Sequence, residues 1–441
     1  MKKMLSQLRV MSLAALAVVA STLPLASAAK AAARVYEVLV EGVQSGFQPV
    51  SLATLGSNTL TGLIATVYEA LDVVSREFVG FIPNVMRNST VERAAKGQTI
   101  TSFITPQSTA SDITPGVTAP NDGDQVLGSQ TFTISKSRYV PIRWNGEEQK
   151  GLNNNGAGST NIMRDQLSQA FRTLTNEVEV DLAAIAYKGA SRAYGTPGTA
   201  PFGIAGDLSD FANTAQILDV NGASPLRTMV VSAASMANLR GKQSVLFKVN
   251  ESGTDDLLRR GMVGEVEAFR IGYGPGIKPV TKGTGASYVT SGSSAIGATA
   301  IPVVTGTGTV LAGDVVTFAG DANKYVVGTG IAAPGTIVLN APGLLTAVGA
   351  GVAVTVGNSF TPNVAFASDG IFLATRLPAV PVDLAGNAMD MADDRTTIID
   401  PWSGLAFELS LYRQYRQIKY ELALAWGVAT PNPAHIALLL G

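Results

Sequence analysis

The chain has no cysteine among its 441 residues. This absence excludes disulfide bonds, thiolate-based metal sites and cysteine nucleophiles. Because exported proteins can also lack cysteine, the compartment in which the protein works does not follow from this feature.

Histidine is nearly absent as well, since His435 in the segment PNPAHIALLLG is the only one. A Ser-His-Asp triad or an imidazole metal site would have to use this residue. No companion motif accompanies it, so we interpret His435 as a partly buried structural or surface residue. We therefore predict no enzymatic activity, no catalytic, cofactor-binding or metal-binding residues, and no cofactor. A hydrolase with a dispersed site around His435 is the minor alternative.

Charge is also scarce, because only 15% of the residues are charged and 32 Lys and Arg stand against 33 Asp and Glu. This balance argues against a basic nucleic-acid-binding protein and against a polybasic membrane-surface protein, although it says nothing of a local patch. The 46% of hydrophobic residues allow a substantial core, and the 46 Gly and 21 Pro indicate many turns.

The first clear pattern is a signal-like leader, MSLAALAVVASTLPLASAAK, over residues 11–30. Basic residues precede it, and Ala26-Ser27-Ala28 offers small side chains at a cleavage site. The apolar run is too short to anchor the chain in a bilayer. The leader alone predicts export.

Residues 57–83 predict an amphipathic helix that lies against other structure. Pro83 ends this helix. Its apolar side chains recur at the three-and-four spacing of one helix face, at Leu63, Ile64, Val67, Tyr68, Leu71, Val74 and Phe78.

Two strands are predicted next, over 98–104 and 130–144, separated by a long polar connection that contains three prolines. A two-stranded ribbon is marginally stable alone. We therefore expect a protruding hairpin whose apolar residues, including Phe132 and Ile134, pack on a neighbouring subunit. The second strand carries its apolar residues on one parity, at Phe132, Ile134, Val140, Ile142 and Trp144.

A long helix is predicted from Asn161, with Gly189 and Gly195 marking its end. About 30 residues make a helix roughly 45 Å long, which is typical of a structural spine. The apolar face comprises Met163, Leu167, Ala170, Phe171, Leu174, Val178, Leu182, Ile185 and Ala186.

Residues 225–280 mix strand and helix patterns, with strands in RTMVVSA and VEAFRIGYGPG and a short helix in SMANLR. Gly272, Gly274 and Gly276 suggest a phosphate-binding loop at first sight. GYGPG lacks the GxGxxG register and contains Pro275, so we interpret it as a turn.

The composition changes abruptly over 283–357, where the charged residues are Asp314, Asp321 and Lys324. Short strand patterns recur there, namely AIPVV, DVVTFAG, KYVVG, GTIVL and VAVTV. We predict a small all-β module inserted into a mixed domain. The alternative is a flexible Gly- and Ala-rich linker.

The C-terminal part predicts a long strand over 418–428, IKYELALAWGV, with Lys419 and Glu421 on one parity and the larger apolar residues on the other, at Ile418, Tyr420, Leu422, Leu424, Trp426 and Val428. Before it, Asp390, Asp393 and Asp394 suggest a metal site or an acid pair. They lack the spacing of a calcium loop and have no imidazole nearby, so we interpret them as a solvated turn.

Several segments in this order resemble the major coat protein of tailed bacteriophages, in the branch typified by short-tailed Salmonella phages. The resemblance covers about residues 57–441 and is carried by NTLTGLIATVYEALDVVSREFVGFIP with VERAAKGQTI, LTNEVEVDLAA, NVAFASDGIFLATRLP and ELALAWGVATPNPAHIALLLG. AGDVVTFAG in the insert is similar to the insertion domain of that branch. Members of the branch usually begin near SNTLTGLI, so the resemblance does not account for residues 1–56.

The resemblance implies an α+β fold of the Hong Kong 97 type. The implied parts are a leader or extension (1–56), an N-terminal arm (57–97), an extended hairpin loop (98–150), a peripheral domain with the spine helix (151–224), an axial-type α/β domain in two parts (225–282 and 358–400), an inserted β domain (283–357) and a closing strand of the peripheral domain (401–441).

The implied function is that of a coat subunit that assembles, without catalysis, into pentamers and hexamers of an icosahedral shell. The implied partners are a scaffolding protein, a portal protein and packaged double-stranded DNA without sequence-specific contacts, and no membrane. The leader would then not serve export. It is a start assigned too far upstream, a cleaved segment or an extension at the inner face of the shell. The alternative is an exported, self-associating surface-layer or adhesin-like protein.

Overall fold

The computed structural model describes Val67 and residues 80–104, 110, 112–113, 115–118, 128–154, 159–243, 264–384, 389–400 and 403–441. All of the described residues belong to one compact unit, Ala65–Gly441. The leader, most of the predicted helix over 57–83 and much of the connection between the hairpin strands lie outside the described residues.

The described residues form an α+β fold, which confirms the predicted class. Its α-helices are α5 (Gly146–Asn154), α6 (Ser159–Lys188), α7 (Ser209–Val220) and α8 (Ala233–Lys242). Its strands form a six-stranded sheet, a twelve-stranded sheet and a two-stranded ribbon. Among the described residues, no helix is long and apolar enough to cross a membrane.

The six-stranded sheet is built around one long strand, β19 (Gln417–Ala429), which confirms the strand predicted over 418–428. β4 (Lys136–Asn145) follows one edge of β19 in antiparallel register, with Tyr420 opposite Ile142. The remaining strands, in sheet order, are β1 (Met86–Ala94), β16 (Phe372–Pro378), then β19 itself, β18 (Ala406–Gln414) and β17 (Asp394–Ile399).

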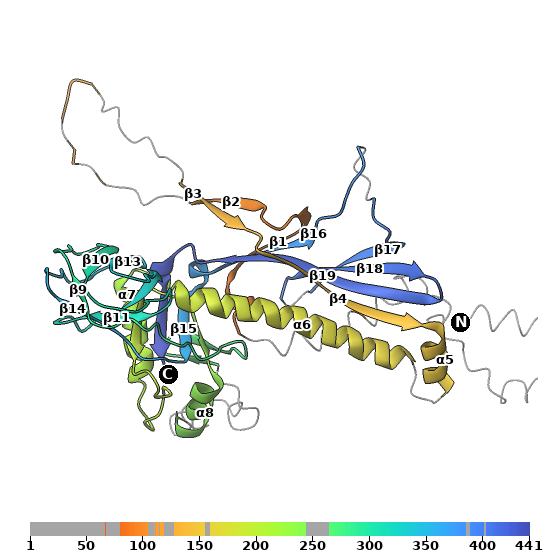
Figure 1. Ribbon diagram of the computed structural model, residues 1–441, viewed down its shortest axis with the longest axis horizontal. Helices are drawn as coiled ribbons and strands as arrows, with labels where there is room; N and C mark the ends of the chain where they lie inside the picture. The colour runs from red at the N-terminus through yellow and green to blue at the C-terminus, as the bar shows by residue number, and fades with distance from the viewer. Residues whose placement is uncertain are drawn as a thin grey trace, which may run out of the picture. The chain divides into compact units, whose positions relative to one another are not determined.

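Helix α6 lies along β4 and β19 (Figure 1). Two indole groups fix this packing: the Trp144 Nε1–H donates to Gln166 Oε1 at 2.7 Å, and the Trp426 Nε1–H donates to Asp181 Oδ2 at 2.9 Å. The predicted 30-residue helix is confirmed. Its predicted apolar face is buried apart from Ile185, which is half-buried.

The twelve-stranded sheet joins the insert to the strands around it. Strands from the insert are β9 (Tyr288–Thr290), β10 (Ala300–Val304), β11 (Val315–Phe318), β12 (Lys324–Thr329), β13 (Gly335–Leu339) and β14 (Ala353–Val356). The others are β5 (Arg192–Gly195), β6 (Arg227–Val231), β7 (Glu265–Val266), β8 (Phe269–Tyr273), β15 (Pro362–Ala367) and β20 (Ile436–Leu440). β12 pairs with β5, placing Lys324 opposite Ala193 and Tyr325 opposite Arg192.

The insert is folded, which excludes the alternative of a flexible linker for residues 283–357. All five predicted strand segments form strands, and the insert has a hydrophobic core of its own that includes Tyr288, Val316, Phe318 and Ile337. The exact domain boundaries stay a prediction, because the sheet continues through β12 into β5.

GYGPG ends β8 with Gly272 and Tyr273 and forms a turn over its last three residues, 274–276, so the predicted turn is confirmed for that part of the motif. A Cβ atom on Gly276 would lie 3.1 Å from the backbone nitrogen of Val180 in α6. The glycine therefore allows this turn to pack closely against the helix backbone, which is a structural role for the motif.

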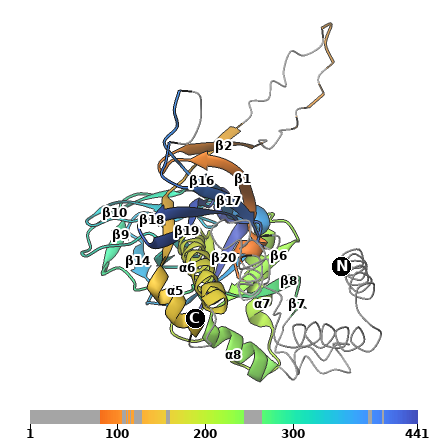
Figure 2. The ribbon, with the colours of Figure 1, turned by 90° about the vertical axis from the view of Figure 1, so that its right-hand side faces the viewer.

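The two-stranded ribbon consists of β2 (Thr99–Ile104) and β3 (Gly128–Thr133), paired with Thr99 opposite Thr133. In Figures 1 and 2 it lies beside β1 and β16. The predicted second strand, 130–144, is interrupted at Ile134 and Ser135, which lie between the end of β3 and the start of β4.

The prediction that Phe132 and Ile134 pack on a neighbouring subunit is wrong. Phe132 is 4% exposed and Ile134 is fully buried within this chain. Their hydrophobic cluster includes Ala94, Phe372 and Ala425, and the Phe132 and Phe372 rings stack with centroids 4.0 Å apart. The base of the ribbon is therefore part of the subunit core.

Candidate assembly surfaces

The connection between β2 and β3 exposes large apolar side chains. In its described part, Ile113 is 96% exposed and Val117 is fully exposed. A single exposed apolar residue is ordinary in soluble proteins. Here two exposed apolar residues lie in the same connection, and the ribbon that carries this connection is buried at its base. The connection is therefore a candidate contact surface for another chain.

The loop between β16 and β17 is a second exposed apolar surface. Its described residues extend away from the six-stranded sheet (Figures 1 and 2). Leu384 is fully exposed, Met391 is 89% exposed, and Met389 and Val382 are also exposed. We call these four residues the apolar loop cluster.

Carboxylates hold the base of this loop. Asp390 is paired with Arg395 and accepts a hydrogen bond from the Tyr412 hydroxyl at 3.1 Å. Asp393 accepts one from the Arg413 backbone N–H at 2.6 Å, and Asp394 begins β17. The sequence grouped these three aspartates in a solvated turn. Asp390 and Asp393 do lie in the loop, where they accept these hydrogen bonds, whereas Asp394 is the first residue of a strand. The described residues contain no cluster of side chains that could hold a metal ion.

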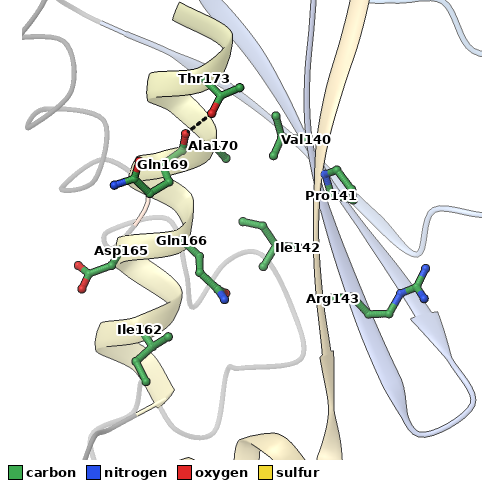
Figure 3. A pocket seen from close by; sticks show the side chains of 10 residues that line it. All are labelled: Val140, Pro141, Ile142, Arg143, Ile162, Asp165, Gln166, Gln169, Ala170 and Thr173. Atoms are coloured by element: carbon green, nitrogen blue, oxygen red, sulfur yellow. Dashed lines mark hydrogen bonds between the residues drawn. The ribbon is translucent and has the colours of Figure 1, made fainter. Parts of the chain in front are cut away.

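A groove between β4 and α6 adjoins the edge of the six-stranded sheet (Figure 3). Its cavity volume is about 440 Å³. Val140 and Ile142 point from β4 toward the helix, whereas Pro141 and Arg143 point away from it. Among the described strands, β4 pairs with β19 alone. Its other edge is thus open, which fits the presence of proline in this strand.

His435 lies in a short 3₁₀ turn, Pro433–His435, where its Nδ1 is 2.8 Å from Asp369 Oδ2. Its side chain is one-fifth exposed, in keeping with the interpretation as a partly buried residue. Sequence reasoning missed the aspartate, which lies 66 positions earlier in the chain.

Sequence reasoning also missed Glu179, which is fully buried in α6. Its two carboxylate oxygens accept the backbone N–H groups of Phe81 and Ile82, each at 3.0 Å. Burial raises the pKa of Glu179 to about 7, against the opposing effect of these two hydrogen bonds. A Cβ on Gly80 would lie 2.9 Å from Glu179 Oε2, so glycine permits this close approach. The carboxyl group attaches the segment before β1 to the spine helix.

Of the comparisons with known proteins, only the one with solved structures finds similar chains. No protein-family model matches the chain, and no curated protein matches it. A structure entitled "Capsid structure of the Cyanophage P-SCSP1u" is 10% identical, with 82% of this chain and 88% of that chain covered and a TM-score of 0.44.

Two further similar structures have lower TM-scores. The "Crystal structure of virus-like particle from Pyrococcus furiosus" is 10% identical over 85% of this chain and 98% of that one, with a TM-score of 0.39. The structure entitled "Mycobacterium phage Che8" is 12% identical over 78% of this chain and 85% of that one, with a TM-score of 0.37. Similarity at this level assigns no function, so any assignment has to rest on the residues of this chain.

Proposed function

We propose that this chain is the major capsid protein of a tailed bacteriophage or prophage, with a fold of the Hong Kong 97 type, and that it belongs to the branch typified by the coat proteins of short-tailed Salmonella phages. The ordered sequence resemblance over residues 57–441 supports the family. The observation that carries the function is that the apolar loop cluster is exposed, although the described part of the chain already buries a large hydrophobic core.

The exposed side chains have a measurable cost. Full burial of a Leu or Met side chain contributes roughly 1.5–3 kcal/mol, and this stabilisation is forgone at Leu384 and Met391 while the subunit is alone. A second copy of this chain is the partner we propose, because closed assemblies reuse one patch on every subunit. A modest gain per contact is then multiplied through the shell.

The finer parts of the proposal follow the resemblance. The subunits form pentamers and hexamers around double-stranded DNA, assemble with a scaffolding protein and a portal protein in the host cytoplasm, and perform no catalysis. The domain boundaries are those set out from the sequence, with residues 283–357 as the inserted β domain. Residues 1–56 are not used for export.

The test is a pair of charge substitutions in the loop cluster, Leu384→Asp and Met391→Asp. Each variant subunit should keep the wild-type circular dichroism spectrum, because neither side chain contributes to the core. Each should reduce the yield of particles at least tenfold in sedimentation with co-expressed scaffold. The control Met391→Leu keeps an apolar side chain of similar size and should assemble normally. Normal particles from both Asp variants would remove this loop from the assembly interface.

Location separates the proposal from its rival. Electron microscopy of the wild-type protein should show closed shells recovered from the cytoplasm, with an N-terminal peptide near residue 57 or with the extension retained. Sheets or fibres recovered from the periplasm or medium, with Ala29 as the first residue, would instead establish an exported surface-layer protein.

A further inference from the structure

A second cavity of about 440 Å³ lies where the insert joins the rest of the fold. β5 and α7 contribute one part of its wall, and the start of β12 with the turn before it contributes another. Its polar lining residues are Arg192, Tyr194, Asn213, Gln216, Asn323 and Lys324. Small-molecule sites commonly have this size and lie at such junctions.

Arg192 is the most unusual residue of this wall, since it is only 5% exposed. Its Nη2 donates to the Ile217 carbonyl at 3.1 Å and to Asn221 Oδ1 at 2.8 Å. Its Nε has no hydrogen-bond partner among the described residues. A buried donor without a partner costs free energy, so the charge of Arg192 is held in this wall without full compensation by the described residues.

Lys324 brings a second cation to the same cavity. Its Nζ donates to the Gly195 carbonyl, and within the described part of the chain no carboxylate is paired with it. Burial lowers the pKa of Lys324 and that of Arg192. Both groups therefore carry a positive charge at some cost in desolvation, which a bound negative charge would offset.

One carboxylate is close enough to act on Arg192. Asp321 favours the charged form of Arg192, but its oxygens already accept hydrogen bonds from Asn323 and from the Tyr325 hydroxyl. Two cations against one engaged carboxylate leave a positive cavity with free donors.

We propose that this cavity binds a small organic anion, through a phosphate or carboxylate group that is attracted by the positive charges of Arg192 and Lys324. The side-chain amide of Gln216 supplies a further donor, while those of Asn213 and Asn323 line the same cavity and also donate to the Ser209 carbonyl and to Asp321. Because the ligand would contact both the insert and β5, its binding would stabilise the junction between them by mass action. This proposal does not rest on the capsid function.

The test is isothermal titration calorimetry of the soluble full-length chain at fixed ionic strength, with pyrophosphate and citrate as probes. We expect saturable binding of at least one probe to a single site, and the stronger probe identifies phosphate or carboxylate as the preferred group. Lys324→Gln should weaken binding at least tenfold. The matched control Lys278→Gln removes an exposed lysine outside this cavity and should leave the affinity unchanged.

Arg192→Gln provides a second variant, because it removes the buried positive charge from the wall of the cavity. If this variant folds, it should abolish binding; if it does not fold, Lys324→Gln decides alone. The proposal is overturned if neither probe binds saturably, or if Lys324→Gln binds as tightly as the wild-type chain. It is also overturned if Lys278→Gln weakens binding as much as Lys324→Gln does, because the cavity would then not be the site.

Discussion

Replacing Phe132 with Asp is expected to prevent the subunit from folding. The Phe132 ring stacks on Phe372 in a cluster that joins the base of the ribbon to the six-stranded sheet. Truncating a buried Phe to Ala costs about 3–5 kcal/mol, and an unpaired buried charge adds several more. The sum is comparable to the whole free energy of unfolding of a typical domain, about 5–15 kcal/mol.

Thr131→Asp is the matched control, because Thr131 lies beside Phe132 in β3 but is exposed. It should give a soluble chain with the wild-type urea midpoint. Phe132→Asp should give insoluble protein or a chain without a cooperative unfolding transition. A Phe132→Asp variant that unfolds at the wild-type urea concentration would place this ring outside the core.

Periodicity predicted the existence of α6 and β19. The apolar positions of α6 recur at helical spacing because the helix lies on the sheet with one side. In β19 the polar residues Lys419 and Glu421 alternate with apolar ones only in the first part of the strand, and residues 422–427 are buried on both faces of the sheet. In α6 the local pattern is sufficient, since the burial of each residue follows from its position along the helix, whereas in β19 alternation identifies the strand but not the burial of its second face.

The ribbon shows where this reasoning fails. Parity identified Phe132 and Ile134 as buried, but it cannot tell which residues bury them. Phe372 lies 240 positions later in the chain, so the local sequence around Phe132 does not predict the contact between the two rings. β1 was missed for a related reason: it pairs in parallel with β16, and its burial does not alternate.

The polar groups of interest depend on the same long-range contacts. Arg192 and Lys324 come together because β5 pairs with β12, and neither lies in a recognisable motif. The burial of Glu179 had a weak indication in the sequence, because the residue lies next to Val178 on the apolar face of α6. Its partners, however, are backbone groups of residues about 100 positions earlier.

The carboxyl group of Glu179 makes the stability of the subunit depend on pH. Its pKa is about 7 in the folded chain against 4.5 for the free side chain. Among the described residues no ion pair reaches it, and the groups that face it are the Phe81 and Ile82 N–H donors. The folded state thus holds a proton over a pH range in which the unfolded state has released it.

The sign follows from proton binding. Stability falls with rising pH wherever the folded state binds more protons than the unfolded state. The contribution of Glu179 is therefore most favourable below pH 4.5, declines between pH 4.5 and about 7, and levels off above that. A pKa difference of this size corresponds to roughly 3 kcal/mol of unfolding free energy.

Glu179→Gln should remove this decline, because the amide is neutral at every pH and occupies nearly the same volume. The urea-unfolding free energy of both chains, measured from pH 4 to pH 9, gives a difference curve in which the titrations they share cancel. We expect the wild-type chain to lose about 3 kcal/mol relative to the variant as the pH rises through 7. The unfolding free energy of the variant is also lower by a constant amount, since its Nε2 cannot accept one of the two N–H groups.

Glu177→Gln is the control, because it removes a partly exposed carboxylate from the same helix and should retain the wild-type decline. A flat difference curve between wild type and Glu179→Gln would mean that Glu179 remains ionised throughout, with its charge balanced by the Phe81 and Ile82 N–H groups.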